Sequence, residues 1–304
     1  MIDLSRIVVG NAAGTVKTME DVLTMCRSGA ANRITVGSIT MEPRDGNAGE
    51  VYYYDERTRT SINALGIPGI GLERYGEALT YMVSAAHNNG KELWVSVAGF
   101  SPNDFSQLTL SCISCGVDGI ELNLGCPNIH DKGERKPIFS YSPDLTANVL
   151  GVLWGPWSTR KLGIKISPVP DDTLPDLARV IVESGIVTEI VAVNTLPNQT
   201  MEKEDGSQAL NFIPPGGSEK IHVGGLAGAP LFPEMLRVVR KLRELLPSQI
   251  RVIAVGGIFS GADALEPLQL GAAGFECATA YLTHGTPNPR VFSDIVGELA
   301  ELAG

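Results

Sequence analysis

The chain has 304 residues, of which 43% are hydrophobic, and this suffices for one barrel domain of about 250 residues with added loops. Its 34 acidic residues outnumber 24 basic residues, giving a net charge of -10. This balance argues against a nucleic-acid-binding surface and favours work on small molecules. No basic leader or long apolar run precedes the first strand-like segment, so we expect a cytoplasmic protein without a membrane span, folded as one domain over residues 1–304.

Short apolar runs alternate with helical patterns along the whole chain, which is typical of a parallel α/β fold. We therefore predict a (β/α)8 TIM barrel with inserted loops over its C-terminal face. The predicted strands cover residues 7–9, 33–36, 92–98, 117–120, 162–166, 189–193, 251–255 and 274–277. The predicted helices cover residues 18–28, 72–89, 102–115, 222–246, 262–270 and 289–302, and another begins at Ser142 and Pro143.

Two segments are too long for ordinary connections between a strand and a helix. The first begins at Met41 and continues through Tyr52–Tyr54, and we predict a lid or an interface there. The second, residues 198–220, is rich in glycine and proline and has little periodicity. We predict that it forms a mobile flap over the site.

Cys126 lies just past the end of a predicted buried strand, between Asn123 and Asn128, and Pro127 stiffens the turn. A cysteine is more often a small hydrophobic core residue, but amide groups on both sides favour contact with a ligand. Such amides donate and accept hydrogen bonds together, which suits a planar imide or ureide ring better than a phosphate or a metal.

The five cysteines are scattered and odd in number, which does not fit a disulfide framework. Cys112 and Cys115 have CxxC spacing, but no second pair or nearby histidines complete a set of four ligands. We therefore predict no metal site.

Small residues gather in the last third of the chain, at Gly224–Gly225, at Gly256–Gly257 and at Ala278–Thr279. Loops after the last strands of a (β/α)8 barrel commonly bind phosphate, because bare backbone N–H groups approach the anion there. One glycine pair alone would indicate only a tight turn. Two pairs followed by a small-residue turn predict a phosphate site.

An ordered set of motifs resembles those of class 1 dihydroorotate dehydrogenases, over nearly the whole chain. The motifs are Ser-Ile-Asn-Ala-Leu-Gly-Ile-Pro from residue 61, Asn-Leu-Gly-Cys-Pro-Asn from residue 123, Lys165, Asn194-Thr195, Val-Gly-Gly-Leu-Ala-Gly from residue 223 and Ala-Val-Gly-Gly-Ile from residue 254. The resemblance implies a flavin-dependent barrel, with FMN as cofactor, that oxidises dihydroorotate to orotate in pyrimidine biosynthesis. A cysteine base and the missing N-terminal extension indicate a class 1, 1A-like member.

The same resemblance implies a homodimer and fumarate as a possible electron acceptor. The sequence leaves open an NAD-linked alternative with an iron–sulfur partner subunit.

Carried over to this chain, the resemblance assigns Cys126 as the base that removes the C5 proton while C6 gives a hydride to flavin N5. Activity should then rise with pH, because a thiol of pKa ~8.5 is only partly ionised at neutral pH. Lys165 would stabilise the reduced flavin near N1 and O2. The implied substrate-binding residues are Asn63, Leu65, Gly66, Ile67, Asn123, Asn128, Asn194 and Thr195. The implied cofactor-binding residues are Ala12, Ala13, Gly14, Gly37, Ser38, Lys165, Gly224, Gly225, Gly256, Gly257, Ala278 and Thr279.

Gly37 departs from the family pattern. Aligned without gaps from Glu42 and Arg44, it stands where the family usually has a lysine that contacts both the flavin and the substrate carboxylate. A buried charge-assisted contact of this kind is worth roughly 1.5–3 kcal/mol. Either another cation replaces it, with Arg44 and Lys203 as candidates, or the substrate lacks the carboxylate.

Two other functions are compatible with the same residues. The first is a related flavoprotein that acts on another dihydropyrimidine, of the dihydrouracil or dihydrouridine type. The motif around Cys126 also resembles that of tRNA-dihydrouridine synthases, although the acidic charge argues against tRNA. The second is a non-catalytic flavin-binding homologue, which Gly37 favours and Cys126 with its amides disfavours.

Overall fold

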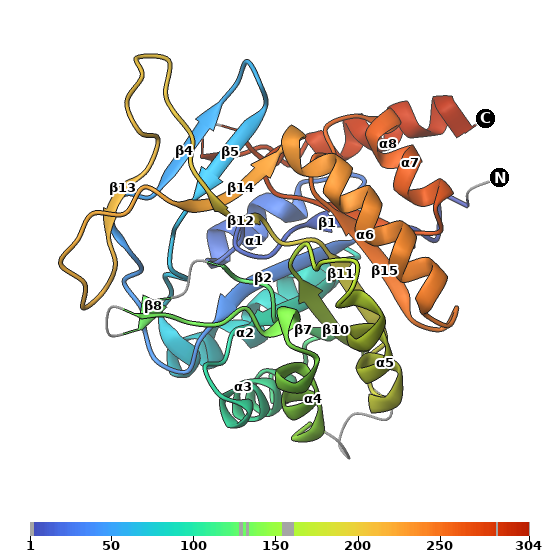
Figure 1. The fold of residues 1–304 in the computed structure, drawn as a ribbon. Coiled ribbons are helices and arrows are strands. Elements are labelled where there is room, and N and C mark those ends of the chain that lie inside the picture. The colour runs from blue at the N-terminus through green and yellow to red at the C-terminus, as the bar shows by residue number, and fades with distance from the viewer. Residues whose placement is uncertain (1–2, 128–129, 132–133, 154–160, 284, 304) are drawn as a thin grey trace.

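The computed structural model describes residues 3–127, 130–131, 134–153, 161–283 and 285–303 (Figure 1). Eight parallel strands close into a barrel whose spatial order follows the chain, and this confirms the predicted (β/α)8 fold. The barrel strands are β1 (Val8–Asn11), β2 (Arg33–Ile39), β6 (Glu92–Val97), β7 (Gly119–Asn123), β10 (Lys161–Ile166), β11 (Glu189–Ala192), β15 (Arg251–Val255) and β16 (Gly274–Cys277).

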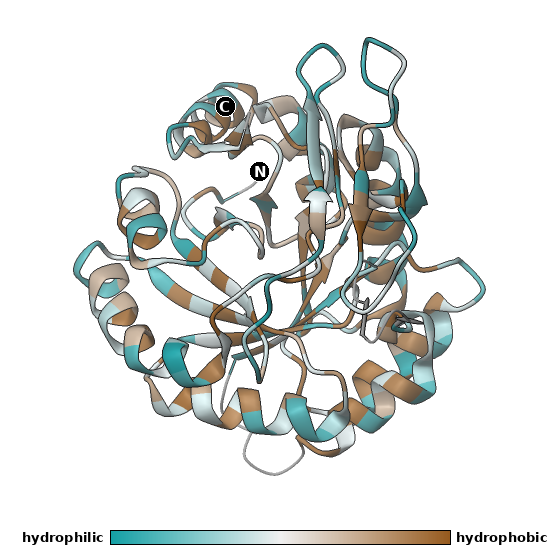
Figure 2. Ribbon diagram, turned by 90° about the vertical axis from the view of Figure 1, so that its left-hand side faces the viewer, coloured by the Kyte–Doolittle hydropathy of each residue, from teal (hydrophilic) through white to brown (hydrophobic). Residues whose placement is uncertain are grey.

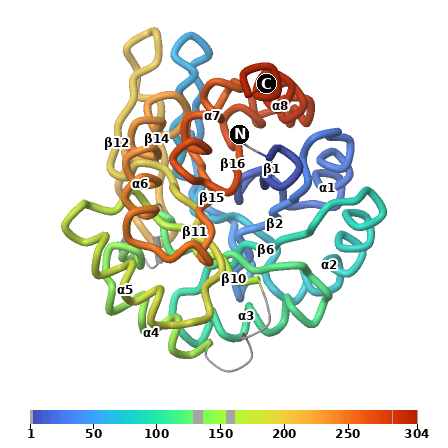
Figure 3. The backbone as a smooth tube through the Cα atoms, turned by 90° about the vertical axis from the view of Figure 1, so that its right-hand side faces the viewer, coloured from blue at the N-terminus to red at the C-terminus, as the bar shows by residue number. Residues whose placement is uncertain are grey.

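Helices surround the barrel, as Figures 1 and 3 show. They carry hydrophobic and hydrophilic residues on different faces (Figure 2), as expected where one face packs on the strands. Within the described ranges, none of the helices is both long and apolar enough to span a membrane. The helices are α1 (Met19–Cys26), α2 (Gly71–Asn88), α3 (Pro102–Ser114), α4 (Pro143–Gly151), α5 (Leu174–Ser184), α6 (Phe232–Leu245), α7 (Gly261–Gln269) and α8 (Val291–Ala303), with short 3-10 turns η1 (Phe139–Tyr141) and η2 (Ala229–Leu231).

Local sequence signals explain where several helices begin. Thr18, Ser101, Ser142 and Ser260 each accept a hydrogen bond from the backbone N–H three residues later, which satisfies a donor that the first turn leaves free. The start predicted at Ser142 and Pro143 is therefore confirmed.

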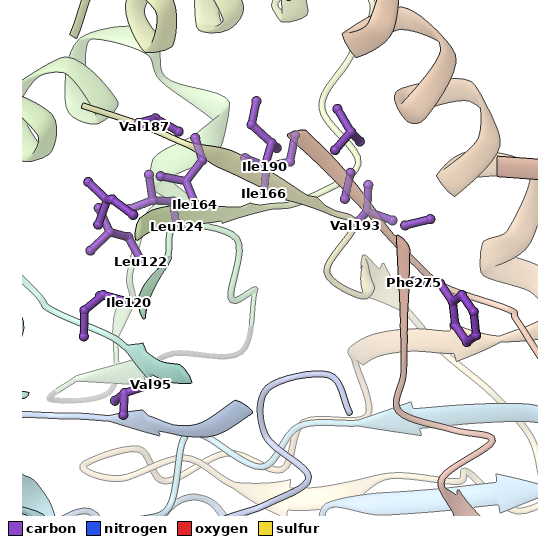
Figure 4. Packing of buried hydrophobic residues seen from close by; sticks show 14 of the residues in the cluster. Val95, Ile120, Leu122, Leu124, Ile164, Ile166, Val187, Ile190, Val193 and Phe275 are labelled. Carbon is purple, nitrogen blue, oxygen red and sulfur yellow. The ribbon is translucent and has the colours of Figure 1, made fainter. Parts of the chain in front are cut away.

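Side chains along a strand point alternately to its two faces, and both faces of the barrel strands are buried. Every second side chain therefore points outward to the helices. Figure 4 shows this outer layer, where Ile120 and Leu122 of β7 lie beside Ile164 and Ile166 of β10 in the main hydrophobic cluster. The alternate side chains point into the barrel, and many of these are charged or polar.

Part of the barrel interior is filled by the side chains of Trp94, Arg33 and Glu189. The Arg33 guanidinium lies 3.9 Å from the Trp94 ring centroid and forms two hydrogen bonds to Glu189, at 2.5 and 3.1 Å. Gly119 makes room for this layer, because a Cβ atom there would lie 2.5 Å from the Trp94 ring. A large aromatic ring and a buried ion pair therefore replace the usual aliphatic filling.

The inserted segments form a second layer above the carboxyl ends of the barrel strands (Figure 1). The four-stranded antiparallel sheet has the order β12-β14-β5-β4, and β3 pairs with β13 beside it. These strands are β3 (Ala48–Glu50), β4 (Tyr52–Asp55), β5 (Thr60–Asn63), β12 (Leu196–Gln199), β13 (Asn211–Ile213) and β14 (Gly224–Gly228). The short pairs β8 (His130–Asp131) with β9 (Glu134–Arg135) and β17 (Leu282–Thr283) with β18 (Thr286–Pro287) complete the set.

The structure differs from the sequence-based prediction in this upper layer. Within residues 198–220, the segment predicted as a mobile flap, β13 pairs with β3 and Phe212 is buried with Leu210 against Ile62. The helix predicted from residue 222 begins only at Phe232. Its predicted first residues instead form β14, which pairs with β5 over Gly225–Gly228.

The buried ion pair generates a prediction about stability. Glu189 is fully buried and also accepts a hydrogen bond from Arg251 at 2.6 Å. We expect Glu189→Ala to lower the free energy of unfolding by about 3–5 kcal/mol, because the buried charge of Arg33 then loses its main partner. The measurement is urea-induced unfolding.

The matched control is Glu183→Ala, which removes an exposed ion pair with Arg179. We expect a loss below about 1 kcal/mol for this control. Equal losses in the two variants would show that the buried pair contributes no more than a surface pair.

Candidate active site

A cavity lies at the carboxyl ends of the barrel strands, beneath the antiparallel sheet, and encloses about 1200 Å³ including the part open to solvent. Residues far apart in the sequence meet there, and half of them were predicted as site residues. The predicted residues that line it are Ala12, Ala13, Gly14, Ser38, Asn63, Leu65, Gly66, Ile67, Asn123, Cys126, Lys165, Asn194, Thr195, Gly256, Gly257, Ala278 and Thr279.

Three of the predicted residues that the structure describes do not appear in this wall, and a fourth is not described. Asn128 lies outside the described residues. Gly224 and Gly225 lie in β14, where their backbone pairs with neighbouring strands, and Gly228 at the other end of β14 lines the cavity instead. Gly37 is packed against the neighbouring strand β6, where a Cβ atom would lie 2.4 Å from the Ser96 carbonyl oxygen.

Cys126 reaches the cavity because the chain after β7 is tied to β10. The N–H of Leu124 donates to the Lys165 carbonyl at 3.0 Å, and the Ser167 hydroxyl donates to the Gly125 carbonyl at 2.7 Å. Gly125 lies so close to β10 that a Cβ atom would be 2.6 Å from backbone atoms at the end of that strand. The next residue, Cys126, is a partly exposed cysteine in the cavity wall.

Polar side chains from three barrel strands form a hydrogen-bonded row along one wall. The Asn123 amide donates to Ser38 Oγ at 2.8 Å, and the Asn194 amide donates to Asn123 Oδ1 at 3.2 Å. Asn194 Oδ1 accepts a hydrogen bond from the N–H of Thr195 at 2.8 Å. The buried Thr195 hydroxyl has no partner among the described residues. Because buried polar atoms are nearly always hydrogen-bonded, this hydroxyl marks a place for a ligand.

Lys165 lies buried at the floor of the cavity and attracts the buried carboxyl groups of Glu121 and Glu276. Burial and the neighbouring Glu121 raise the pKa of Glu276 to about 8, while Lys165 and Arg33 oppose this shift. Burial also raises the pKa of Glu121, and attraction to Lys165 opposes that shift too. The two acids therefore interact with this lysine through electrostatic attraction, and Glu121 Oε1 and both Glu276 carboxyl oxygens have no hydrogen-bond partner among the described residues.

The opposite end of the cavity is lined by small residues and backbone. Gly256 and Gly257 follow β15 and have φ angles of +133° and +73°, which other residues rarely adopt. A Cβ atom at Gly257 would lie 2.6 Å from Phe232. Thr279, after β16, forms a hydrogen bond with Ser61 at 2.8 Å. Such bare backbone at the last two strands suits an anionic group.

The structure also brings to the cavity residues that sequence reasoning missed, among them Lys17, Tyr52, Phe259 and Glu276. Lys17 follows the small-residue loop after the first strand, and its position there is the signal that could have found it. Its ammonium group donates to the Pro68 carbonyl at 2.6 Å.

The two cations suggested as replacements for the missing lysine lie elsewhere. Arg44 donates to the Gly66 carbonyl at 3.2 Å and lies over the Phe100 ring, and Lys203 is paired with Glu50 at 2.7 Å. Neither lines the cavity.

A barrel with titratable and amide groups converging at the carboxyl ends of its strands defines an enzyme site for a small molecule. A family model described as dihydroorotate dehydrogenase matches residues 6–302. The dihydroorotate dehydrogenase A (fumarate) of Lactococcus lactis subsp. cremoris is 31% identical over 296 residues, which cover 96% of this chain and 89% of the relative. A putative dihydroorotate dehydrogenase A (fumarate) of Streptococcus uberis is 28% identical over 293 residues, covering 96% and 88%.

Structural comparison agrees at the level of the fold. A crystal structure of the DHODH of Eimeria tenella in complex with ferulenol matches with a TM-score of 0.81 and 22% identity, over 99% of this chain and 85% of that chain. The chain therefore belongs to the dihydroorotate dehydrogenase family. Its members are flavin-dependent oxidoreductases that act on CH–CH bonds.

The floor of the site generates a prediction about pH. The pKa of Glu276 in the native state is about 8, above the ordinary value of 4.5 for a glutamate, so the native state holds a proton that the unfolded state releases between these pH values. The contribution of this proton to the free energy of unfolding is complete below the pKa of the unfolded state. It is lost as pH rises to about 8, and the free energy of unfolding falls by up to about 1.4 kcal/mol per pH unit.

Glu276→Gln keeps the shape of the side chain but removes this titration. We therefore expect the stability of the variant relative to wild type to rise between about pH 5.5 and pH 8, as measured by urea unfolding. A constant difference between variant and wild type across this range would contradict the raised pKa.

Proposed function

We propose that this protein oxidises dihydroorotate to orotate in pyrimidine biosynthesis, with FMN as its cofactor. The observation that carries the proposal is the position of Cys126, a cysteine that lines the same cavity as the amide groups of Asn123 and Asn194. A thiol base beside groups that bind an imide edge is what proton removal from a dihydropyrimidine ring requires.

The residues present fit FMN. The glycine-lined end after β15 and β16 suits the phosphate, and the loop after β1 suits the flat ring because its side chains are small. When bound, FMN accepts the hydride from substrate C6 at its N5 atom. Lys165 provides a positive charge at the floor, where negative charge develops on the cofactor. The proposed cofactor-contacting residues are Ala12, Ala13, Gly14, Ser38, Lys165, Gly256, Gly257, Ala278 and Thr279.

The chain's own residues then bind and orient the substrate. Asn63, Asn123 and Asn194 hold the amide edges of the ring, and the unpartnered Thr195 hydroxyl supplies a further hydrogen bond. Cys126, as the thiolate, removes the C5 proton, and the C5–H electron pair forms the new C5=C6 double bond. The two electrons of the C6 hydride leave for the cofactor, so the ring loses one proton and one hydride.

Fumarate, which the names of both bacterial relatives specify, is the proposed electron acceptor. Its reduction to succinate consumes two electrons and two protons, which balances the oxidation of dihydroorotate. By resemblance to class 1 members we also propose that the protein works as a cytoplasmic homodimer.

Anaerobic titration of the purified flavoprotein with dihydroorotate tests this function. We expect stoichiometric loss of the oxidised-flavin absorbance, followed by its recovery when fumarate is added. Reduction of the flavin by dihydrouracil but not by dihydroorotate would show that the substrate is a neutral ring without a carboxylate. A protein that binds no flavin even after FMN is supplied would overturn the proposal from the cofactor upward.

Replacing the thiol tests the assigned base. We expect Cys126→Ala to slow flavin reduction by dihydroorotate about 10²- to 10⁴-fold, because general base catalysis contributes on this scale. Stopped-flow absorbance measures the rate. The control is Cys115→Ala, because Cys115 lies at the end of α3 and does not line the cavity. In this variant dihydroorotate should reduce the flavin at the wild-type rate. A Cys126→Ala variant with wild-type reduction kinetics would remove Cys126 from this role.

A further inference from the structure

The wall of the cavity next to β2 has no room for the lysine that the family usually carries there. Gly37 has a φ angle of +119°, and a Cβ atom would lie 2.4 Å from the Ser96 carbonyl oxygen. This neighbour is backbone and does not move aside as a flexible side chain does. A positive charge for a carboxylate must therefore come from another element.

The loop between β1 and α1 lies directly on Gly37. The N–H of Gly37 donates to the Val16 carbonyl at 3.0 Å, and the N–H of Gly14 donates to the Gly37 carbonyl at 2.8 Å. Lys17 is the next residue after Val16. The backbone that carries Lys17 is thus anchored at the position where the family's lysine is missing.

Two contacts fix Lys17 at both ends. Its backbone N–H donates to the Asp21 carboxylate at 2.9 Å, at the start of α1. Its ammonium group donates to the Pro68 carbonyl at 2.6 Å, beside the segment Leu65–Ile67 that also lines the cavity. Lys17 therefore spans from the β1 loop to the segment proposed to hold the substrate.

Lys17 lines the same cavity as Cys126. Desolvation by the surrounding protein lowers the pKa of Lys17, while Cys126 and Asp21 oppose this shift. In the described part of the chain Lys17 forms no ion pair, and its ammonium bonds to a neutral carbonyl. An arriving carboxylate would favour the charged form and would gain more there than in water.

We propose that Lys17, on the loop after β1, supplies the positive charge that binds the carboxylate of dihydroorotate. In the family, a lysine on β2 performs this task. This inference rests on the proposed function. An ammonium group has three donors, so Lys17 keeps its bond to Pro68 while donating to the carboxylate. The other cation in the described cavity wall, Lys165, is buried at the floor and is attracted by the acids Glu121 and Glu276.

The test compares the binding of orotate with that of uracil, which is the same ring without the carboxylate. The variants are Lys17→Met, which keeps length but removes charge, and Lys17→Arg, which keeps charge. The matched control is Lys203→Met, since Lys203 is a cation of the upper layer paired with Glu50. Dissociation constants come from the perturbation of the flavin spectrum and from calorimetry on the FMN-loaded protein.

We expect Lys17→Met to weaken orotate binding about 10- to 100-fold and to leave uracil binding within about twofold of wild type. Lys17→Arg should recover most of the orotate affinity, and Lys203→Met should bind both ligands as wild type does. Bound flavin and unchanged uracil binding show that Lys17→Met is folded.

Two outcomes would overturn the inference, and they separate it from the proposed function. Wild-type protein that binds orotate tightly, with Lys17→Met binding it equally well, would remove Lys17 from the carboxylate site and leave the proposed function intact. Wild-type protein that binds uracil but not orotate would overturn both, because the site would then take no carboxylate.

Discussion

The site rests on a layer of buried charges whose mutual compensation makes the barrel interior possible. Arg33 bonds to Glu189 through two hydrogen bonds, and Lys165 interacts electrostatically with the buried acids Glu121 and Glu276. Each of these groups alone would be costly to bury, so the layer is stable only as a set. It also gives the cavity a cationic floor at Lys165, where a reduced flavin would carry its negative charge.

Close backbone packing decides which residues reach the cavity. Gly125 lies against β10 and thereby delivers Cys126, while Gly37 lies against β6 and leaves no space for a side chain. The same Gly37 backbone holds the loop that presents Lys17. A departure from the family's pattern on one strand is thus accompanied by a cation on the adjacent loop, and both follow from one set of backbone contacts.

The sequence predicted the barrel from local signals, and the motifs that resemble the family predicted half of the cavity wall. A buried strand followed by Asn123 and Cys126 needs no knowledge of the rest of the chain. The sequence-based prediction failed where pairing between distant segments decides which structure a segment adopts. Residues Gly224–Gly228 form a strand because β5, far earlier in the chain, offers them an edge. Lys17 looked like an ordinary residue at a helix start, since its role depends on the docking of its loop on Gly37.

The most direct measurement is a crystal structure of the FMN-loaded protein with orotate bound. The prediction is an orotate ring in the cavity with C5 facing Cys126, its amide edges on Asn123 and Asn194, and its carboxylate within hydrogen-bond distance of the Lys17 ammonium. A ring bound with C5 turned away from Cys126, or a cavity that stays free of orotate at saturating concentration, would contradict the proposed chemistry.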